Sequence, residues 1–167
     1  MKNLEIERKF LVDKNKWASA GRPPGILYIQ GYLSIDQEKI IRVRVAGNTG
    51  FITVKGKSEI LIRSEYEYVI PVEEARDLLK MFTRNQIEKT RYRVPVGNFI
   101  FEVDEFHGMN KGLFLAEVEL SSPADVFEKP QWLGKEVTEN IQYYNAYLSE
   151  NPFIFWGEQE SLVNKNP

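Results

Sequence analysis

Carboxylates and an ammonium alternate with apolar residues in the first strongly patterned segment of the chain. This segment, NLEIERKFLV, carries Glu5, Glu7 and Lys9 on every second residue. Side chains two residues apart share a face of an extended strand. One face therefore presents oxygen donors suited to a hard divalent cation, beside an ammonium suited to an anion.

The alternation of charged and apolar residues returns along most of the segments that the sequence predicts as strands. If each strand turns its charged face the same way, that face holds these cations: Lys9, Arg42, Arg44, Lys55, Lys57, Arg63, Lys89, Arg91 and Arg93. It also holds these carboxylates: Glu5, Glu7, Glu65, Glu67, Glu102, Asp104, Glu117 and Glu119. The second strand adds Tyr28, Gln30 and Tyr32. The signs segregate, since the third, fourth and sixth strands are basic and the last two are acidic.

Two interpretations account for this charged face. An antiparallel sheet commonly has one apolar and one solvated face, and the charges would then be ordinary surface. The segregation by sign and the prominence of arginine, whose planar fork matches phosphate, favour an inward-facing site. Burying so many unpaired ions is unfavourable, so the interior must hold water or a highly charged ligand. An anion with several phosphates, bridged to Mg²⁺ or Mn²⁺, matches both signs.

The elements that must position these residues are mainly short strands. Alternation and turn residues predict eight strands, at residues 3–12, 27–33, 40–45, 51–57, 63–70, 87–94, 99–106 and 113–120. The spacing of apolar residues predicts helices at residues 14–20, 71–82 and 134–151. The strands and the first two helices form two halves, each running strand, helix and three strands. We therefore expect an α+β fold, in which two such β-α-β-β-β halves close into an eight-stranded antiparallel β-barrel, a tunnel with a polar, charged lumen and helices packed outside.

Length and composition fit a single globular domain. The chain has 167 residues, 43% of them hydrophobic and 28% charged, and a net charge of -2. We expect one domain over residues 1–150, which includes the C-terminal helix, and a C-terminal tail over residues 151–167. The slightly acidic balance argues against nucleic acid as a partner, and no apolar run approaches the roughly 18 residues of a membrane span. The charged N-terminus does not resemble a signal peptide, so we expect a cytoplasmic protein.

Rare residue types exclude several classes of site. The sequence contains no cysteine, which excludes disulfides, thiol catalysis and Cys-based metal sites. His107 is the one histidine, which argues against a His-rich metal centre or a Ser-His triad. The tripeptide GKS at residues 56–58 lacks the earlier glycine of a P-loop, because that position is Phe51.

The ordered motifs resemble those of the CYTH domain superfamily, also called triphosphate tunnel metalloenzymes. EIERKFLV fits the ExExK signature of that superfamily, and IRVRV, ITVKGK, RSEYEY, KTRYRV, FEVDEF and LAEVEL follow in order. The resemblance covers residues 3–148 and is greatest to the short, single-domain bacterial members of the inorganic triphosphatase type. It implies an eight-stranded antiparallel tunnel that acts on a triphosphate with a divalent metal.

The resemblance also implies roles for the charged residues. It assigns metal binding to these carboxylates: Glu5, Glu7, Asp104, Glu117 and Glu119. It assigns phosphate binding to these cations: Lys9, Arg42, Arg44, Lys55, Lys89 and Arg91, with Lys57 and Arg63 as additions. Glu65 and Glu67 are expected to orient the cations, whereas the roles of Arg93 and Glu102 stay open.

Two residues are the candidate catalytic groups. Lys9 neighbours the first carboxylates and is expected to position or deprotonate the attacking water. Tyr32 shares the inward face and is expected to hold the lysine and that water in place.

The implied activity is metal-dependent hydrolysis of a triphosphate, with inorganic tripolyphosphate, cleaved to pyrophosphate and phosphate, as the favoured substrate. Family members also include class IV adenylate cyclases, which convert ATP to cyclic AMP and pyrophosphate, and thiamine triphosphatases. A non-catalytic module that binds polyphosphate or nucleotides is the alternative of another class, although the complete cationic and carboxylate sets argue against it. The sequence does not choose between Mg²⁺ and Mn²⁺, between one and two metal ions, or between a monomer and a homodimer.

Overall fold

The computed structural model describes residues 4–36, 38–57 and 62–157. The side chains of Leu4, Glu5, Ile62 and Arg63 also lie outside the described part, although their backbones are included. The fold is mostly antiparallel β-sheet with few helices. None of the described helices is both long and apolar enough to cross a membrane.

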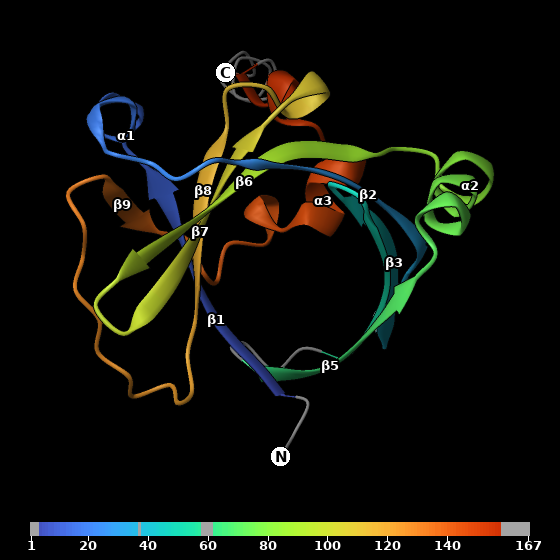
Figure 1. Cartoon of the computed structure of the whole chain (residues 1–167), viewed down its shortest axis with the longest axis horizontal. Coiled ribbons are helices and arrows are strands. Elements are labelled where there is room, and N and C mark those ends of the chain that lie inside the picture. The colour runs from blue at the N-terminus through green and yellow to red at the C-terminus, as the bar shows by residue number, and fades with distance from the viewer. Residues whose placement is uncertain (1–3, 37, 58–61, 158–167) are drawn as a thin grey trace, which may run out of the picture.

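Within the described residues, nine strands form the sheet. They are β1 (Leu4–Val12), β2 (Ile26–Ile35), β3 (Lys39–Ala46), β4 (Thr49–Gly56), β5 (Ile62–Ile70), β6 (Ile87–Val96), β7 (Phe99–Phe106), β8 (Phe114–Glu119) and β9 (Leu133–Glu136). Their order is β5-β4-β3-β2-β6-β7-β8-β1-β9, and β1 also pairs with β5 through its first three residues. The strands curve around a common centre, with β1 and β5 meeting at the bottom of the view (Figure 1).

All eight predicted strands are present, but the described part of the chain contains one strand more than the eight predicted. The additional strand, β9, pairs Glu136 with Phe10 and Leu133 with Val12 of β1. Its four residues are too few to show an alternating pattern, and their conformation depends on a partner more than 120 residues earlier in the chain. Sequence periodicity does not report such a long-range pairing.

The first two predicted helices are confirmed. In α1 (Lys14–Ser19), the Asp13 carboxylate accepts hydrogen bonds from the backbone N–H groups of the first turn, as expected of an N-cap. In α2 (Val72–Phe82), Ala75 and Leu79 are buried against Val43 and Val45 of β3. Both helices lie outside the curved sheet (Figure 1).

The predicted helix over residues 134–151 is wrong. This segment instead contains the end of β9, a 3₁₀ helix η2 (Ile141–Tyr143) and a short α3 (Asn145–Glu150). The backbone N–H of Val137 donates to the Lys9 carbonyl, and the Thr138 hydroxyl accepts from the Lys9 N–H. Bonds to β1 therefore replace the i to i+4 bonds that a continuous helix would need.

The expectation that all helices pack outside is also wrong. The first residues of α3 line the interior of the curved sheet, where the Asn145 side chain accepts a hydrogen bond from Lys89. Leu148, one turn later, is fully buried in an apolar cluster with Phe106 and Leu115. The helix thus has one polar side for the interior and one apolar anchor.

The chain just after residue 151 is packed rather than loose. A 3₁₀ helix, η3 (Phe153–Phe155), follows α3, and the Phe153 N–H donates to the Asn110 side chain over 2.8 Å. Phe153 and Trp156 pack against the cluster that buries Leu148. Residues 158–167 lie outside the described part, and the division into a domain and a tail stays a prediction.

Candidate active site

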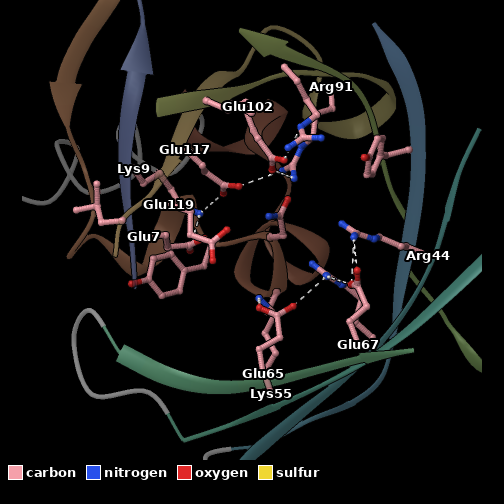
Figure 2. Close-up of a pocket in the computed structure, with 18 of the residues that line it drawn as sticks. Glu7, Lys9, Arg44, Lys55, Glu65, Glu67, Arg91, Glu102, Glu117 and Glu119 are labelled. Atoms are coloured by element: carbon pink, nitrogen blue, oxygen red, sulfur yellow. Dashed lines mark hydrogen bonds and ion pairs between the residues drawn. The ribbon is translucent and has the colours of Figure 1, made fainter. Parts of the chain in front are cut away.

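A cavity of about 680 Å³ lies inside the curved sheet. Charged side chains of both signs line it: Glu7, Lys9, Arg42, Arg44, Lys55, Glu65, Glu67, Arg91, Arg93, Glu102, Glu117 and Glu119. Figure 2 shows two groups of them, with Glu7, Lys9, Glu117 and Glu119 on one side and Lys55, Glu65, Arg44 and Glu67 on the other. The inward-facing interpretation of the charged strands is therefore correct for these residues.

Strand register gathers four carboxylates, which we call the carboxylate wall: Glu7, Glu102, Glu117 and Glu119. Glu7 lies directly opposite Glu119 on the neighbouring strand, and Glu102 lies opposite Glu117. Like charges in such cross-strand pairs repel each other, so this wall needs cations to be stable.

Lys9 supplies the first of these cations. Its ammonium donates to Glu117 over 2.6 Å and lies 3.9 Å from Glu7. The side chain is only 2% exposed, and its Nζ lies 5.0 Å from the centre of the Tyr144 ring. Burial alone would lower the pKa of Lys9, but Glu117 and Glu7 outweigh it and raise this pKa above its ordinary value. Lys9 therefore stays protonated, which suits a fixed charge better than a base.

Arg91 is the second cation of the carboxylate wall. Its guanidinium donates to Asp104 over 2.7 and 2.6 Å, to Glu117 over 3.0 Å, and also to Glu102. Burial would raise the pKa of Glu117, yet Lys9 and Arg91 hold it well below its ordinary value. Glu117 is thus ionised and shared between two cations.

Lys89 and Asp104 form a layer behind Arg91. Each is 1% exposed, and neither lines the cavity in the described structure. The Lys89 ammonium donates to Asp104 over 2.6 Å and to Asn145 over 3.2 Å. Burial and the neighbouring Arg91 lower the pKa of Lys89 to about 8, because Asp104 is shared with Arg91 and compensates only in part.

Cations dominate the opposite side of the cavity, the basic wall, which consists of Arg42, Arg44 and Lys55. Arg44 donates to both oxygens of Glu67 over 2.9 and 3.0 Å, and Arg42 lies 3.4 Å from the same carboxylate. Lys55 lies 2.9 Å from Glu65. Glu65 and Glu67 therefore pair with the cations, as the sequence predicts.

The basic wall keeps spare donor capacity. The Nε atoms of Arg42 and Arg44 are buried and have no hydrogen-bond partner within the described part of the chain. Burial and the neighbouring Arg42 also lower the pKa of Arg44. An anion beside these guanidinium groups would relieve the repulsion between the cations.

The remaining predicted site residues are placed differently. Lys57 is 67% exposed, forms an ion pair with Glu38 and does not line the cavity as described. Tyr32 lines the cavity, and its hydroxyl accepts a hydrogen bond from Gln30. The side chains of Glu5 and Arg63 lie outside the described part, although their backbones are opposite each other in the pairing of β1 with β5.

Four residues around the site carry no role in the sequence-based prediction. Thr138 and Tyr144 surround Lys9, and the Tyr144 hydroxyl donates to the Thr138 carbonyl over 2.8 Å. Asn145 contacts Lys89, and Tyr28 contacts two arginines. The sequence pattern indicated only Tyr28, through its inward position on β2. The other three residues lie in the segment that was predicted to form a helix packed outside, so no pattern placed them in the site.

The carboxylate wall offers the type of donor atom that a hard divalent cation prefers. Carboxylate oxygens are the ligands that Mg²⁺ and Mn²⁺ prefer, and Glu7, Glu117 and Glu119 all face the cavity. Among the described residues, however, no three His, Cys, Asp or Glu side chains are placed together to hold a metal ion. Glu117 is directed at Lys9 and Arg91, so metal binding requires these ion pairs to rearrange.

Comparisons with known proteins agree with this arrangement. A family model described as the CYTH domain matches residues 3–149. An inorganic triphosphatase of Acetivibrio thermocellus is 46% identical over 150 residues, which cover 89% of this chain and 95% of that protein. An inorganic triphosphatase of Nitrosomonas europaea is 40% identical over 154 residues, covering 87% and 96%. The crystal structure of the inorganic triphosphatase NE1496 superimposes with a TM-score of 0.59 at 36% identity, over 87% of this chain and 93% of the other.

Proposed function

The chain belongs to the CYTH domain family, and we propose that it is a metal-dependent hydrolase that cleaves inorganic tripolyphosphate to pyrophosphate and phosphate. Two relatives that share 46% and 40% identity with it over almost their whole lengths are inorganic triphosphatases. Near-complete coverage supports a common reaction more strongly than a shared fold would.

The observation that carries the proposal is the opposition of two charged walls across one cavity. A triphosphate needs several cationic donors, which the basic wall and Arg91 supply. Its metal ion needs carboxylates on the other side, which Glu7, Glu117 and Glu119 supply. No neutral or singly charged substrate would use both walls.

The proposed metal ligands are Glu7, Glu117 and Glu119, with Glu5 as a further candidate from the family resemblance. When bound, Mg²⁺ or Mn²⁺ neutralises phosphate charge and supplies a water of lowered pKa. Asp104 was assigned to the same set, but its contacts with Arg91 and Lys89 favour a supporting role.

The chain's own side chains bind and orient the substrate. Arg42, Arg44 and Lys55 hold phosphoryl oxygens on one side, and Arg91 holds them on the other, where developing charge needs fixed donors. Lys9 stays protonated and stabilises negative charge at the reacting phosphoryl group. Lys89 acts behind Arg91 rather than on the substrate, and Lys57 and Arg63 stay predicted additions.

We also propose that the working site is a closed tunnel of eight strands. The pairing of Leu4, Glu5 and Ile6 with residues of β5 joins the two ends of the strand order β5-β4-β3-β2-β6-β7-β8-β1 and supports this closure. The ninth strand extends the sheet beyond β1 and is not part of the ring.

The proposal is tested by product analysis. The purified protein is incubated with Mg²⁺ or Mn²⁺ and, separately, with tripolyphosphate, ATP and thiamine triphosphate, while phosphate, pyrophosphate and cyclic AMP are measured. We expect phosphate release from tripolyphosphate that stops on addition of EDTA. Cyclic AMP with pyrophosphate from ATP would instead identify a class IV adenylate cyclase, and preference for thiamine triphosphate would identify that branch. Tight tripolyphosphate binding without any product would identify a non-catalytic binding module.

A further inference from the structure

Tyr28 of β2 lies between two arginines of the cavity. The guanidinium carbon of Arg44 is 5.3 Å from the centre of the Tyr28 ring, and that of Arg91 is also 5.3 Å from it. Both distances are within the range of a cation–π interaction. The ring itself lines the cavity.

The strand register explains why one ring reaches both arginines. On one side of β2, Tyr28 pairs with Ala46 of β3, two residues from Arg44. On the other side it pairs with Lys89 of β6, two residues from Arg91. Each arginine is therefore a diagonal neighbour of Tyr28, a relationship that long side chains can bridge.

The two arginines otherwise belong to different ion-pair networks. Glu67 holds Arg44 on the basic wall, whereas Asp104, Glu102 and Glu117 hold Arg91 on the carboxylate wall. Phe51 lies against Arg44 as well, and the centre of its ring is 5.0 Å from the guanidinium carbon of Arg44. Within the described part of the chain, Tyr28 is the aromatic ring that contacts both guanidinium groups.

Arg44 and Arg91 carry like charges and share one aromatic ring, so the two guanidinium groups repel each other. Burial is the main cause that lowers the pKa of Arg44, and the positive charges of Arg42 and Arg91 add to it. The negative face of an aromatic ring attracts a guanidinium group, so a ring shared by Arg44 and Arg91 offsets their repulsion before an anion arrives.

We propose that Tyr28 is a positioning residue that sets the separation of Arg44 and Arg91, so that one polyphosphate anion contacts both walls at once. This inference rests on the proposed triphosphate substrate. The aromatic ring is the operative part of Tyr28, because both contacts are made to the ring.

The test compares Tyr28→Phe, which keeps the ring, with Tyr28→Leu, which removes the ring and leaves a smaller apolar side chain. The affinity for inorganic tripolyphosphate is measured by calorimetric titration in EDTA, and kcat and KM for phosphate release are measured with Mg²⁺. The matched control is Tyr68→Leu, at a tyrosine of β5 that is 58% exposed and does not line the cavity as described.

We expect Tyr28→Leu to weaken tripolyphosphate binding about tenfold and to raise KM by a similar factor, with kcat changed about twofold at most. Tyr28→Phe and Tyr68→Leu should bind as the wild type does. A double-mutant cycle separates positioning from a general structural effect: in an Arg44→Ala background, the further change Tyr28→Leu should have little effect on binding.

Several outcomes would overturn the inference. Unchanged affinity in Tyr28→Leu, an equal loss in Tyr28→Phe, or full additivity with Arg44→Ala would each do so. A wild-type protein that binds tripolyphosphate but releases no phosphate would overturn the proposed function, while the same titrations would still decide the role of Tyr28. If Tyr28→Leu fails to fold, the same comparison is made between Tyr28→Phe, which keeps the ring, and Tyr28→Met, which lacks it.

Discussion

The Lys9 ammonium and the Glu117 carboxylate, 2.6 Å apart, form a buried ion pair that joins β1 to β8 at the centre of the carboxylate wall. Glu117 also accepts from Arg91. Glu117 therefore neutralises two cations, Lys9 of β1 and Arg91 of β6, which come from the strands that flank the pair β7 and β8. Several expected results depend on this carboxylate.

Replacing Glu117 with Gln should abolish metal-dependent phosphate release and also destabilise the protein. The substitution removes a proposed metal ligand and leaves Lys9 with only the more distant Glu7. Breaking a buried ion pair costs about 3 kcal/mol in the free energy of unfolding. Activity is measured by phosphate release, and unfolding is followed by circular dichroism in urea.

The control for this variant is Glu73→Gln. Glu73 of α2 pairs with Arg76 away from the cavity, and its side chain is 76% exposed. Such exposed pairs contribute less than about 1 kcal/mol, so activity should be normal and stability almost unchanged. Normal turnover in a folded Glu117→Gln protein would contradict the metal assignment.

The pH dependence of turnover should not report the titration of Lys9. Glu117 and Glu7 overcome the effect of burial and raise the pKa of this lysine in the metal-free protein. When a metal ion engages these carboxylates, the bound triphosphate adds negative charge beside Lys9, so we expect the lysine to stay charged during turnover. We expect Lys9→Met to be inactive at every pH, whereas Lys9→Arg should retain some activity with a kcat/KM profile parallel to that of the wild type. An alkaline limb present in the wild type and missing from Lys9→Arg would restore the base role for Lys9.

Protein stability should rise with pH because of Lys89. Burial and Arg91 lower its folded-state pKa to about 8, against an ordinary value of 10.5. Between these two values the unfolded chain binds more protons, so the contribution of Lys89 to stability is present above pH 10.5 and is lost as the pH falls through about 8. Lys89→Met should remove this slope. Urea unfolding of both proteins from pH 7 to 10 measures it, and equal slopes would contradict the shift.

The Mg²⁺ requirement should depend on Glu7 and Glu119. These two carboxylates lie opposite each other on β1 and β8, and their repulsion falls when a divalent cation lies between them. We expect Glu7→Gln and Glu119→Gln each to raise the Mg²⁺ concentration for half-maximal activity about tenfold or more. Glu105→Gln is the matched control, because Glu105 of β7 bonds to Tyr92 and does not line the cavity as described. Identical Mg²⁺ curves for all three variants would exclude these ligands.

The positions of the strands and the face of most charged residues could be predicted from the sequence. A period of two assigns residues to faces without knowledge of their partners, so Lys9, Arg42, Arg44 and Glu117 were placed correctly inside the sheet. The face on which a side chain lies does not indicate how deeply that side chain is buried. Lys89 and Asp104 share the inward face but are covered by neighbouring side chains, which only the packing of α3 and Arg91 reveals.

The segment from Leu133 to Glu150 was predicted least well. Val137, Ile141, Tyr144 and Leu148 have helical spacing, but the segment forms its bonds with β1 and β6 instead. Propensity and periodicity are local signals, and they cannot show that the strongest available partner lies at the far end of the chain. The contributions of Thr138, Tyr144 and Asn145 to the site were missed for this reason.

The cavity takes its walls from both ends of the described chain, because Glu7 and Lys9 meet Tyr144, Asn145 and Ala146 around it. During synthesis, β1 leaves the ribosome before the other described elements. About 135 further residues must follow before Lys9 gains the Tyr144 ring and the Thr138 hydroxyl. The protein therefore has no finished site on a partial chain. A nascent fragment that ends before α3 lacks the part of the cavity wall that Tyr144, Asn145 and Ala146 supply.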